Sequence, residues 1–102
     1  MRSDLEHSEF VFCDLQEIAC FMRRQDASLP GRFFAATRKT FLLIAVNPRL
    51  GKLWKSSLPE ELRSRPVMGF QNYMIFYWIR DDKIMIWRVL HGSRDLPALL
   101  ND

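Results

Sequence analysis

The sequence predicts an α+β fold in which an antiparallel helical hairpin packs on a three- to four-stranded antiparallel sheet. Two segments of the first half, 8–25 and 30–45, repeat apolar residues at helical spacing. Two runs rich in β-branched and aromatic residues, Tyr73–Arg80 and Lys83–His91, follow near the C-terminus, and only Asp81-Asp82 separates them. Helices that precede strands are typical of an antiparallel sheet with helices on one face.

The first helix is expected from Ser8 to Gln25. Ser8 followed by Glu9 is typical of a helix start, because a serine hydroxyl accepts a hydrogen bond from a free amide of the first turn. Polar residues, Asp14 among them, should lie off the apolar stripe. The stripe expected to face the core is Val11, Leu15, Ile18 and Met22.

The second helix is expected from Pro30 to Ala45. Proline suits the first turn of a helix, and Asn47-Pro48 ends it because a proline ring disfavours helical backbone in the preceding residue. The short connection between the two helices predicts an antiparallel hairpin. The stripe expected to face the core is Phe34, Thr37, Phe41 and Ile44.

The remaining elements give weaker signals. Residues 51–61 read as a loop, with Trp54 against the core. Arg63–Met68 reads as a weak strand, and Pro66 assigns it to a sheet edge or a bulge, since proline donates no ladder hydrogen bond. Arg2–His7 could form a first strand, although its alternation is poor.

The predicted hairpin has two apolar faces. If Arg80 pairs with Lys83, strict alternation assigns each side chain to one face. The first face would carry Tyr73, Ile75, Tyr77, Ile79, Ile84, Ile86 and Leu90, and the second Met74, Phe76, Trp78, Met85, Trp87 and Val89.

A helical hairpin covers only one face of a sheet, and the other is normally polar. Met and Trp are enriched at binding surfaces. We therefore expect a partner chain on Met74, Phe76, Trp78, Met85 and Trp87. The alternative is that the 51–61 loop folds over this face.

Composition sets the general class of the protein. A chain of 102 residues with 48% hydrophobic content is expected to form a single domain over residues 1–102. The net charge of +3 is too small to diagnose nucleic-acid binding. The longest apolar run, Phe41–Val46, is far shorter than a membrane span, and the N-terminus lacks the apolar core of a signal peptide.

The two cysteines, Cys13 and Cys20, are seven residues apart on the first predicted helix. They would lie ~10 Å apart along the axis, beyond the ~7 Å that a disulfide allows between Cα atoms. Free, buried thiols and a cytoplasmic location are therefore expected.

Candidate chemistry lies at the end of the last strand. His91 and Arg94, with Arg63 and Arg88, could bind a phosphate, arginine holding the anion and histidine moving protons. The structural alternative is that His91 caps the strand end while Arg88 and Asp95 form an ion pair. Cys13, His7 and His91 lack metal-ligand spacing, so neither a metal nor another cofactor is expected.

Several stretches in order resemble the ParE branch of the RelE/ParE superfamily, toxins of type II toxin–antitoxin pairs. The most specific stretch is the run from Arg88 to Asp95. The others are Asp14-Leu15 with Ile18, Asn47-Pro48-Arg49-Leu50-Gly51, Leu62-Arg63, and Phe70 with Tyr73, Ile75, Phe76 and Tyr77.

The resemblance implies a β-α-α-β-β-β fold and a cytoplasmic bacterial toxin that a cognate antitoxin neutralises. ParE-type toxins act on DNA gyrase, whereas RelE-type relatives cut mRNA in the ribosome with basic residues and a Tyr or His near the C-terminus. No Tyr follows Arg94 here, which favours the gyrase inhibitor, a protein that is not an enzyme. On this interpretation Arg63, Arg88, His91 and Arg94 bind the target.

Two alternatives stay open. Because His91 is present, the chain could be a ribosome-dependent endoribonuclease, and His91, Arg63, Arg88 and Arg94 would then be its catalytic residues. The chain could also be a non-toxic module that only binds the antitoxin.

Overall fold

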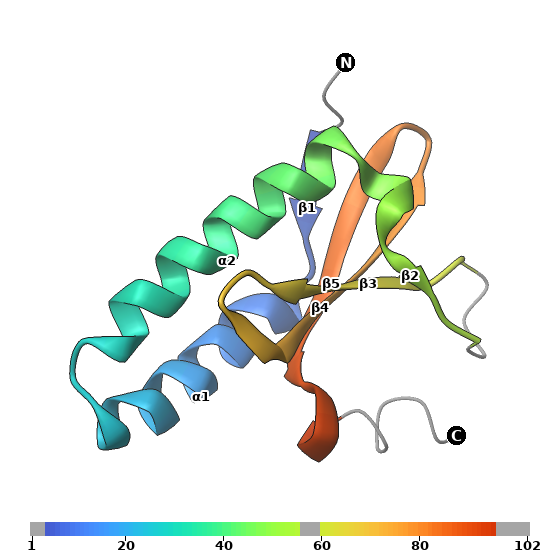
Figure 1. Ribbon diagram of the computed structural model, residues 1–102. Coiled ribbons are helices and arrows are strands. Elements are labelled where there is room, and N and C mark those ends of the chain that lie inside the picture. Colours follow the sequence, from blue (N-terminus) through green and yellow to red (C-terminus); the bar gives the residue numbers. More distant parts are fainter. Residues whose placement is uncertain (1–3, 56–59, 96–102) are drawn as a thin grey trace.

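The computed structural model describes residues 4–55 and 60–95. It confirms the α+β class, with two long helices packed on one face of a sheet (Figure 1). The elements are β1 (Asp4–His7), α1 (Glu9–Gln25), α2 (Leu29–Val46), the 3₁₀ helix η1 (Pro48–Leu50), β2 (Lys52–Leu53), β3 (Arg63–Val67), β4 (Phe70–Arg80) and β5 (Lys83–His91). A helical turn follows at residues 92–95.

The sheet is larger than predicted and is mixed. Its order is β1-β5-β4-β3-β2, and β1 runs parallel to β5 while the other neighbours are antiparallel. The expectation of three to four antiparallel strands is therefore wrong in count and in the direction of β1. A two-residue strand such as β2 carries no alternation to read, and the direction of β1 depends on a pairing partner far away in the sequence.

The helical hairpin begins and ends within one residue of the prediction. The Ser8 hydroxyl accepts a hydrogen bond from the Phe10 amide at 3.2 Å and donates one to the Trp87 carbonyl. This serine therefore starts α1 and also fastens it to β5. Figure 1 shows α1 and α2 running in opposite directions side by side.

Two details of the predicted helix stripes are wrong. Asp14 is buried, at 4% exposure, because its carboxylate has partners in β5. Phe33 is fully buried in place of Phe34, which is 42% exposed. The buried face of α2 includes Thr40, whose hydroxyl donates to the Ala36 carbonyl at 2.8 Å, so this polar residue is satisfied inside the core.

Both cysteines are exposed, which corrects the expectation of buried thiols. Cysteine is among the residue types most often buried, but composition cannot show which face of a helix a residue occupies. Cys13 and Cys20 are two turns apart, and both lie on the solvent side of α1.

The β4–β5 hairpin is confirmed, with Arg80 paired to Lys83. Asp81 and Asp82 have φ angles of 51° and 64°, the left-handed pair of a two-residue turn that matches the twist of the strands. The β3 strand is also confirmed, and its register shifts between Pro66 and Val67, where β2 no longer pairs with it.

A bulge in β5 changes the predicted faces. Phe76 pairs with Arg88 and Tyr77 pairs with Ile86, so Trp87 is the extra residue. Beyond the bulge the alternation reverses. Val89 joins the cluster under the helices and Leu90 joins the cluster on the opposite face, the reverse of the expectation.

Two apolar clusters result. The larger lies between the helices and the sheet, around Phe33, Ile44, Ile75, Tyr77 and Ile86. The smaller lies on the other face and consists of Leu62, Phe76 and Leu90, with Trp54, Met74, Trp78 and Trp87 packed against it. Both faces of the sheet are therefore partly covered in the free chain.

Candidate functional site

Arg88, one of the predicted site residues, is held by the buried carboxylate of Asp14. Its Nε and Nη2 donate to the two Asp14 oxygens at 2.8 and 2.9 Å, and the Val89 amide donates to the same carboxylate at 3.0 Å. The hydrogen bonds to Asp14 raise the pKa of Arg88 above its ordinary value. Arg88 therefore joins α1 to β5, and the alternative pairing of Arg88 with Asp95 is wrong.

His91 and Arg94 lie at the end of β5. The His91 Nδ1 accepts a hydrogen bond from the Arg94 amide at 3.2 Å, so the ring caps the helical turn that follows. A neutral ring with Nδ1 as acceptor carries its proton on Nε2. The ring packs edge-on against Tyr73, with centroids 5.2 Å apart, and burial raises the pKa of the Tyr73 phenol.

Arg94 pairs with its neighbour Asp95, the Nε to Oδ1 distance being 3.2 Å. Partial burial alone would raise the pKa of Asp95, but hydrogen bonds from Arg94 and from the His91 amide lower it below its ordinary value. The Arg94 side chain is 51% exposed and lies over the Phe21 ring at 5.6 Å. It is the most accessible cation of this strand end.

Arg63 lies elsewhere. Its Nη1 donates to the carbonyls of Arg49 and Gly51, both at 3.0 Å, and it pairs with Tyr77 in the sheet. His91 pairs with Tyr73, four residues away along β4 or roughly 13 Å at strand rise. The fold thus brings His91 and Arg94 to one end of the sheet, with Arg88 three residues before His91 on β5, and it holds Arg63 apart from His91 and Arg94.

The predicted Met and Trp face is only partly accessible to a partner chain. Phe76 is fully buried, since Trp54 packs on it with ring centroids 5.8 Å apart and Leu62 lies beside it. The Trp54 indole also donates to the Ser64 hydroxyl at 2.6 Å, which fixes it there. The described part of the 51–61 segment therefore covers Phe76, and the expectation that a partner covers this residue is wrong.

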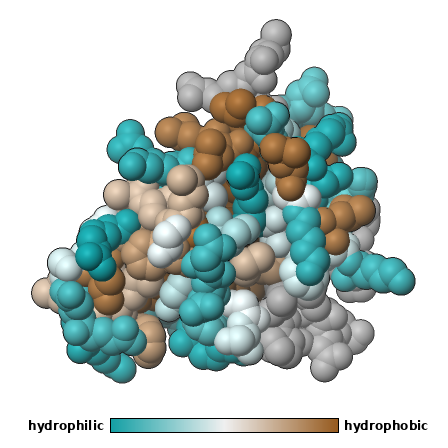
Figure 2. Space-filling model, in the orientation of Figure 1, coloured by the Kyte–Doolittle hydropathy of each residue, from teal (hydrophilic) through white to brown (hydrophobic). Residues whose placement is uncertain are grey.

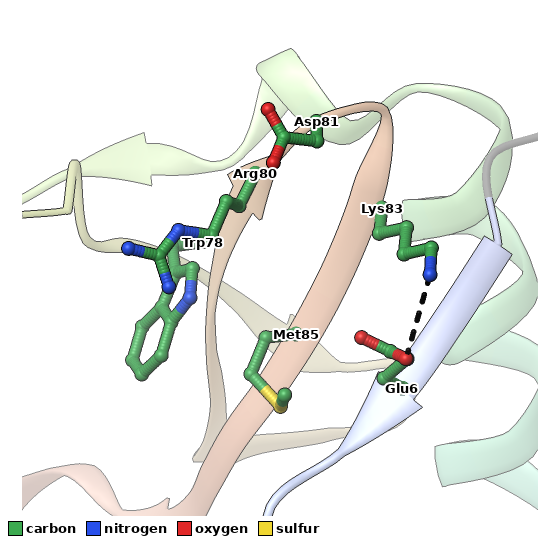
Figure 3. Close-up of a pocket in the computed structure, with 6 residues that line it drawn as sticks. All are labelled: Glu6, Trp78, Arg80, Asp81, Lys83 and Met85. Atoms are coloured by element: carbon green, nitrogen blue, oxygen red, sulfur yellow. Dashed lines mark ion pairs between the residues drawn. The ribbon is translucent and has the colours of Figure 1, made fainter.

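The other four residues of that face are half-buried. Trp78 and Trp87 contact each other, with centroids 5.6 Å apart. Figure 3 shows Trp78 and Met85 in a pocket near the hairpin turn, together with Arg80, Asp81, Lys83 and Glu6. Glu6 and Lys83 form a 4.0 Å ion pair across the β1–β5 edge, so polar groups surround the two apolar side chains.

A second surface was missed by sequence reasoning. Large apolar side chains are exposed along the outer side of α2 and beyond its end. They are Phe34, Leu42, Leu43, Val46, Leu50 and Leu53, at 39–71% exposure. Figure 2 shows strongly hydrophobic atoms gathered at the top of the molecule, where Figure 1 places the C-terminal end of α2.

The charge pattern of the same segment is also unusual. Residues 27–59 contain six Lys and Arg residues and no Asp or Glu, so this stretch carries +6 in a chain whose total is +3. The rest of the chain is therefore at −3. This segregation is readable from sequence and is typical of a surface that meets an acidic partner.

Comparison with known families agrees with this architecture. The sequence model of one family, described as ParE toxin of type II toxin-antitoxin system, parDE, matches residues 12–96. The chain belongs to the ParE toxin family. A search of curated proteins finds no match to the chain.

The family match includes every predicted site residue from Arg63 to Arg94, and it begins after β1. Membership makes the chain the toxin of a type II toxin–antitoxin system, with a cognate antitoxin as its partner. Within residues 4–55 and 60–95, no helix is both long and apolar enough to span a membrane.

Proposed function

We propose that this ParE-family toxin inhibits DNA gyrase, and so replication, by binding rather than by catalysis. The observation that carries the proposal is the family match over residues 12–96. The arrangement of the basic residues supports it. A phosphodiester-cleaving site needs its groups to converge on one reacting atom, yet Arg63 is roughly 13 Å from His91 along the sheet and Arg88 is occupied by Asp14.

His91 and Arg94 are the proposed target contacts at the end of β5, with Arg88 beside them. Arg94 is exposed enough to reach another molecule, and the His91 cap fixes the turn that carries it. Arg63 would contribute indirectly, because it holds the 49–51 segment through two carbonyls.

We propose that the antitoxin binds the half-buried side chains Met74, Trp78, Met85 and Trp87. Partly solvent-exposed aromatic and Met side chains on a sheet face favour association with a partner. The exposed apolar residues of α2 extend the surface on which an acidic antitoxin could lie, and the charge of residues 27–59 supports this extension.

Induced expression in a sensitive bacterium tests the gyrase proposal. Filamentous cells, a DNA-damage response and loss of plasmid supercoiling are expected, and coexpression of the antitoxin should relieve all three. An Arg94→Ala variant, which removes the most accessible cation of the strand end, should weaken these effects, whereas Arg80→Ala at the hairpin turn should not. Normal supercoiling in cells that nevertheless stop growing contradicts the proposal.

The second candidate function is that of a ribosome-dependent endoribonuclease. One observation favours it, namely that His91 presents Nε2 while Nδ1 is fixed by the Arg94 amide. A histidine acid or base contributes roughly 100- to 10,000-fold to a rate. His91→Ala should then abolish mRNA cutting in a translation extract, and full toxicity in His91→Ala removes this candidate.

The third candidate, a non-toxic antitoxin-binding module, makes a different prediction. Expression should leave growth unchanged while the antitoxin is still bound tightly. A growth defect that the antitoxin relieves rules it out.

A further inference from the structure

The outer face of α1 has a composition unusual for a solvated helix surface. Cys13 and Cys20 are both exposed, and Phe10, Phe12 and Phe21 are 46%, 68% and 41% exposed. Cysteine is among the most buried residue types, so two exposed thiols on one helix are unexpected. None of these five residues is itself a proposed target or antitoxin contact, and Phe10 and Phe21 pack against the neighbouring Arg88 and Arg94.

The two thiols point in nearly the same direction. Seven residues make almost two helical turns, which separates Cys13 from Cys20 by ~10.5 Å along the axis. They cannot form a disulfide with each other, because disulfides need Cα atoms within about 7 Å. Each thiol could meet a thiol only on another chain.

The stripe that carries the thiols is complementary to itself when a second copy runs antiparallel. The midpoint between Cys13 and Cys20 is also the midpoint between Glu9 and Arg24, both of which are exposed on this face. A twofold axis through that midpoint sets Cys13 opposite Cys20 of the second copy. It sets Glu9 opposite Arg24 of the second copy, and each pair occurs twice.

The flanks of the stripe match as well. An antiparallel twofold pair brings the same flank of both helices together. Phe10 and Phe21, which contact Arg88 and Arg94 of their own chain, share one flank. Phe10 would then lie against Phe21 of the second copy, a favourable aromatic pair.

We propose that this toxin forms a twofold-symmetric dimer in which two α1 helices pack antiparallel through the Cys13, Cys20, Glu9 and Arg24 stripe. The small cysteine side chains allow close approach of the helix axes, and the charges at both ends of the stripe fix the direction. One contact opposes this arrangement, since Glu17 lies near its own symmetry mate. Arg88 and Arg94 lie close to Glu17 and offset that repulsion.

The register can be trapped covalently. Diamide, an azo oxidant, takes two electrons and two protons from a thiol pair and becomes the corresponding hydrazine as one S–S bond forms. In the proposed dimer only Cys13 and Cys20 of different copies are in reach. Two Cys13 side chains, or two Cys20 side chains, lie ~10.5 Å apart along the axis.

Single-cysteine variants give the decisive test. Full-length Cys13→Ser and Cys20→Ser proteins are oxidised with diamide separately and as a mixture, then run on a non-reducing gel. The mixture is expected to give a covalent dimer and each variant alone to remain monomeric. Covalent dimer from either variant alone indicates a parallel pair or random collision and overturns the proposal, as does the absence of any dimer in the mixture.

Charge reversal tests the same interface without oxidation. Arg24→Glu should weaken dimerisation roughly tenfold or more in sedimentation equilibrium, because two attractive pairs become repulsive. The double variant Glu9→Arg with Arg24→Glu should restore it, while Lys39→Glu on α2 should change little. A wild-type chain that stays monomeric up to millimolar concentration, or a double variant that is not restored, contradicts the proposed dimer.

Discussion

Replacing Asp14 by alanine should destabilise the fold more than removing any exposed charged side chain. The carboxylate is 4% exposed and accepts three hydrogen bonds, two from Arg88 and one from the Val89 amide. Removing one partner of a fully buried ion pair costs about 3–5 kcal/mol. The Arg88 side chain is 26% exposed, so water recovers part of that loss.

The unsatisfied Val89 amide adds a penalty of about 1–3 kcal/mol. Counting the ion pair at about 2–3 kcal/mol after that recovery and adding the amide, we expect Asp14→Ala to lower the free energy of unfolding by about 3–6 kcal/mol. Urea denaturation followed by far-UV circular dichroism measures this change. Glu17→Ala, an exposed acid of the same helix, is the matched control and should stay within about 0.5 kcal/mol of the wild type.

A double-mutant cycle separates the ion pair from general damage to α1. Arg88→Met combined with Asp14→Ala removes both charges, so its cost should fall short of the sum of the single costs by at least about 1 kcal/mol. Additive losses, or an Asp14→Ala cost below about 1 kcal/mol, would refute the role given to this pair.

Three other substitutions test separate parts of the structure. Gly51→Ala should lower the free energy of unfolding in urea by about 1–3 kcal/mol, since a Cβ there overlaps the Tyr77 hydroxyl. Its control is Gly31→Ala, which has open space around it and should be neutral or stabilising by up to about 1 kcal/mol. The pKa of Asp95 is lower in the folded chain than its ordinary value of 3.8, so its carboxylate stabilises the fold above that value, and this stability is lost as the pH falls through the lowered pKa. Asp95→Asn should therefore lose less stability than the wild type below about pH 4. Trp87→Ala should weaken antitoxin binding roughly tenfold or more in calorimetry, while Phe34→Ala, a matched loss of an aromatic ring on α2, should weaken it less if the proposed Met and Trp face predominates.

Local patterns were sufficient to predict much of the fold. The Ser8 cap, the Asn47-Pro48 end of α2 and the Asp81-Asp82 turn each depend on neighbouring residues alone, and all three are confirmed. The parallel pairing of β1 with β5 was missed because it joins residues nearly eighty positions apart.

The most consequential error of the prediction was to miss the bulge at Trp87. Alternation assumes an unbroken ladder, and one extra residue exchanges Val89 and Leu90 between the faces. The burial of Asp14 was also missed. Its hydrogen-bond donors, the Arg88 guanidinium and the Val89 amide, belong to a strand far away in the sequence, so the pattern of the helix alone could not indicate that a carboxylate is satisfied inside the core.

The residues of the candidate site were predictable one by one, but their arrangement in space was not. Sequence order joined Arg88, His91 and Arg94 correctly at one strand end, but it could not show that Arg63 binds the carbonyls of Arg49 and Gly51. The positive charge of residues 27–59 was readable from sequence as a run without a carboxylate, a signal that averaging over the whole chain hides. The exposed apolar side chains of the same segment became apparent only in the structure.

The most direct test of the proposed function is the state of DNA on purified gyrase. Gyrase, relaxed plasmid and ATP are incubated with the full-length toxin, and supercoiled, relaxed and cleaved DNA are separated on a gel after detergent and protease treatment. We expect supercoiling to fall and protein-linked cleaved DNA to accumulate with toxin concentration, and prior addition of antitoxin to prevent both. Unchanged supercoiling and no cleaved DNA, from a protein sample that cuts ribosome-bound mRNA in a parallel translation reaction, would contradict the account and establish the nuclease instead.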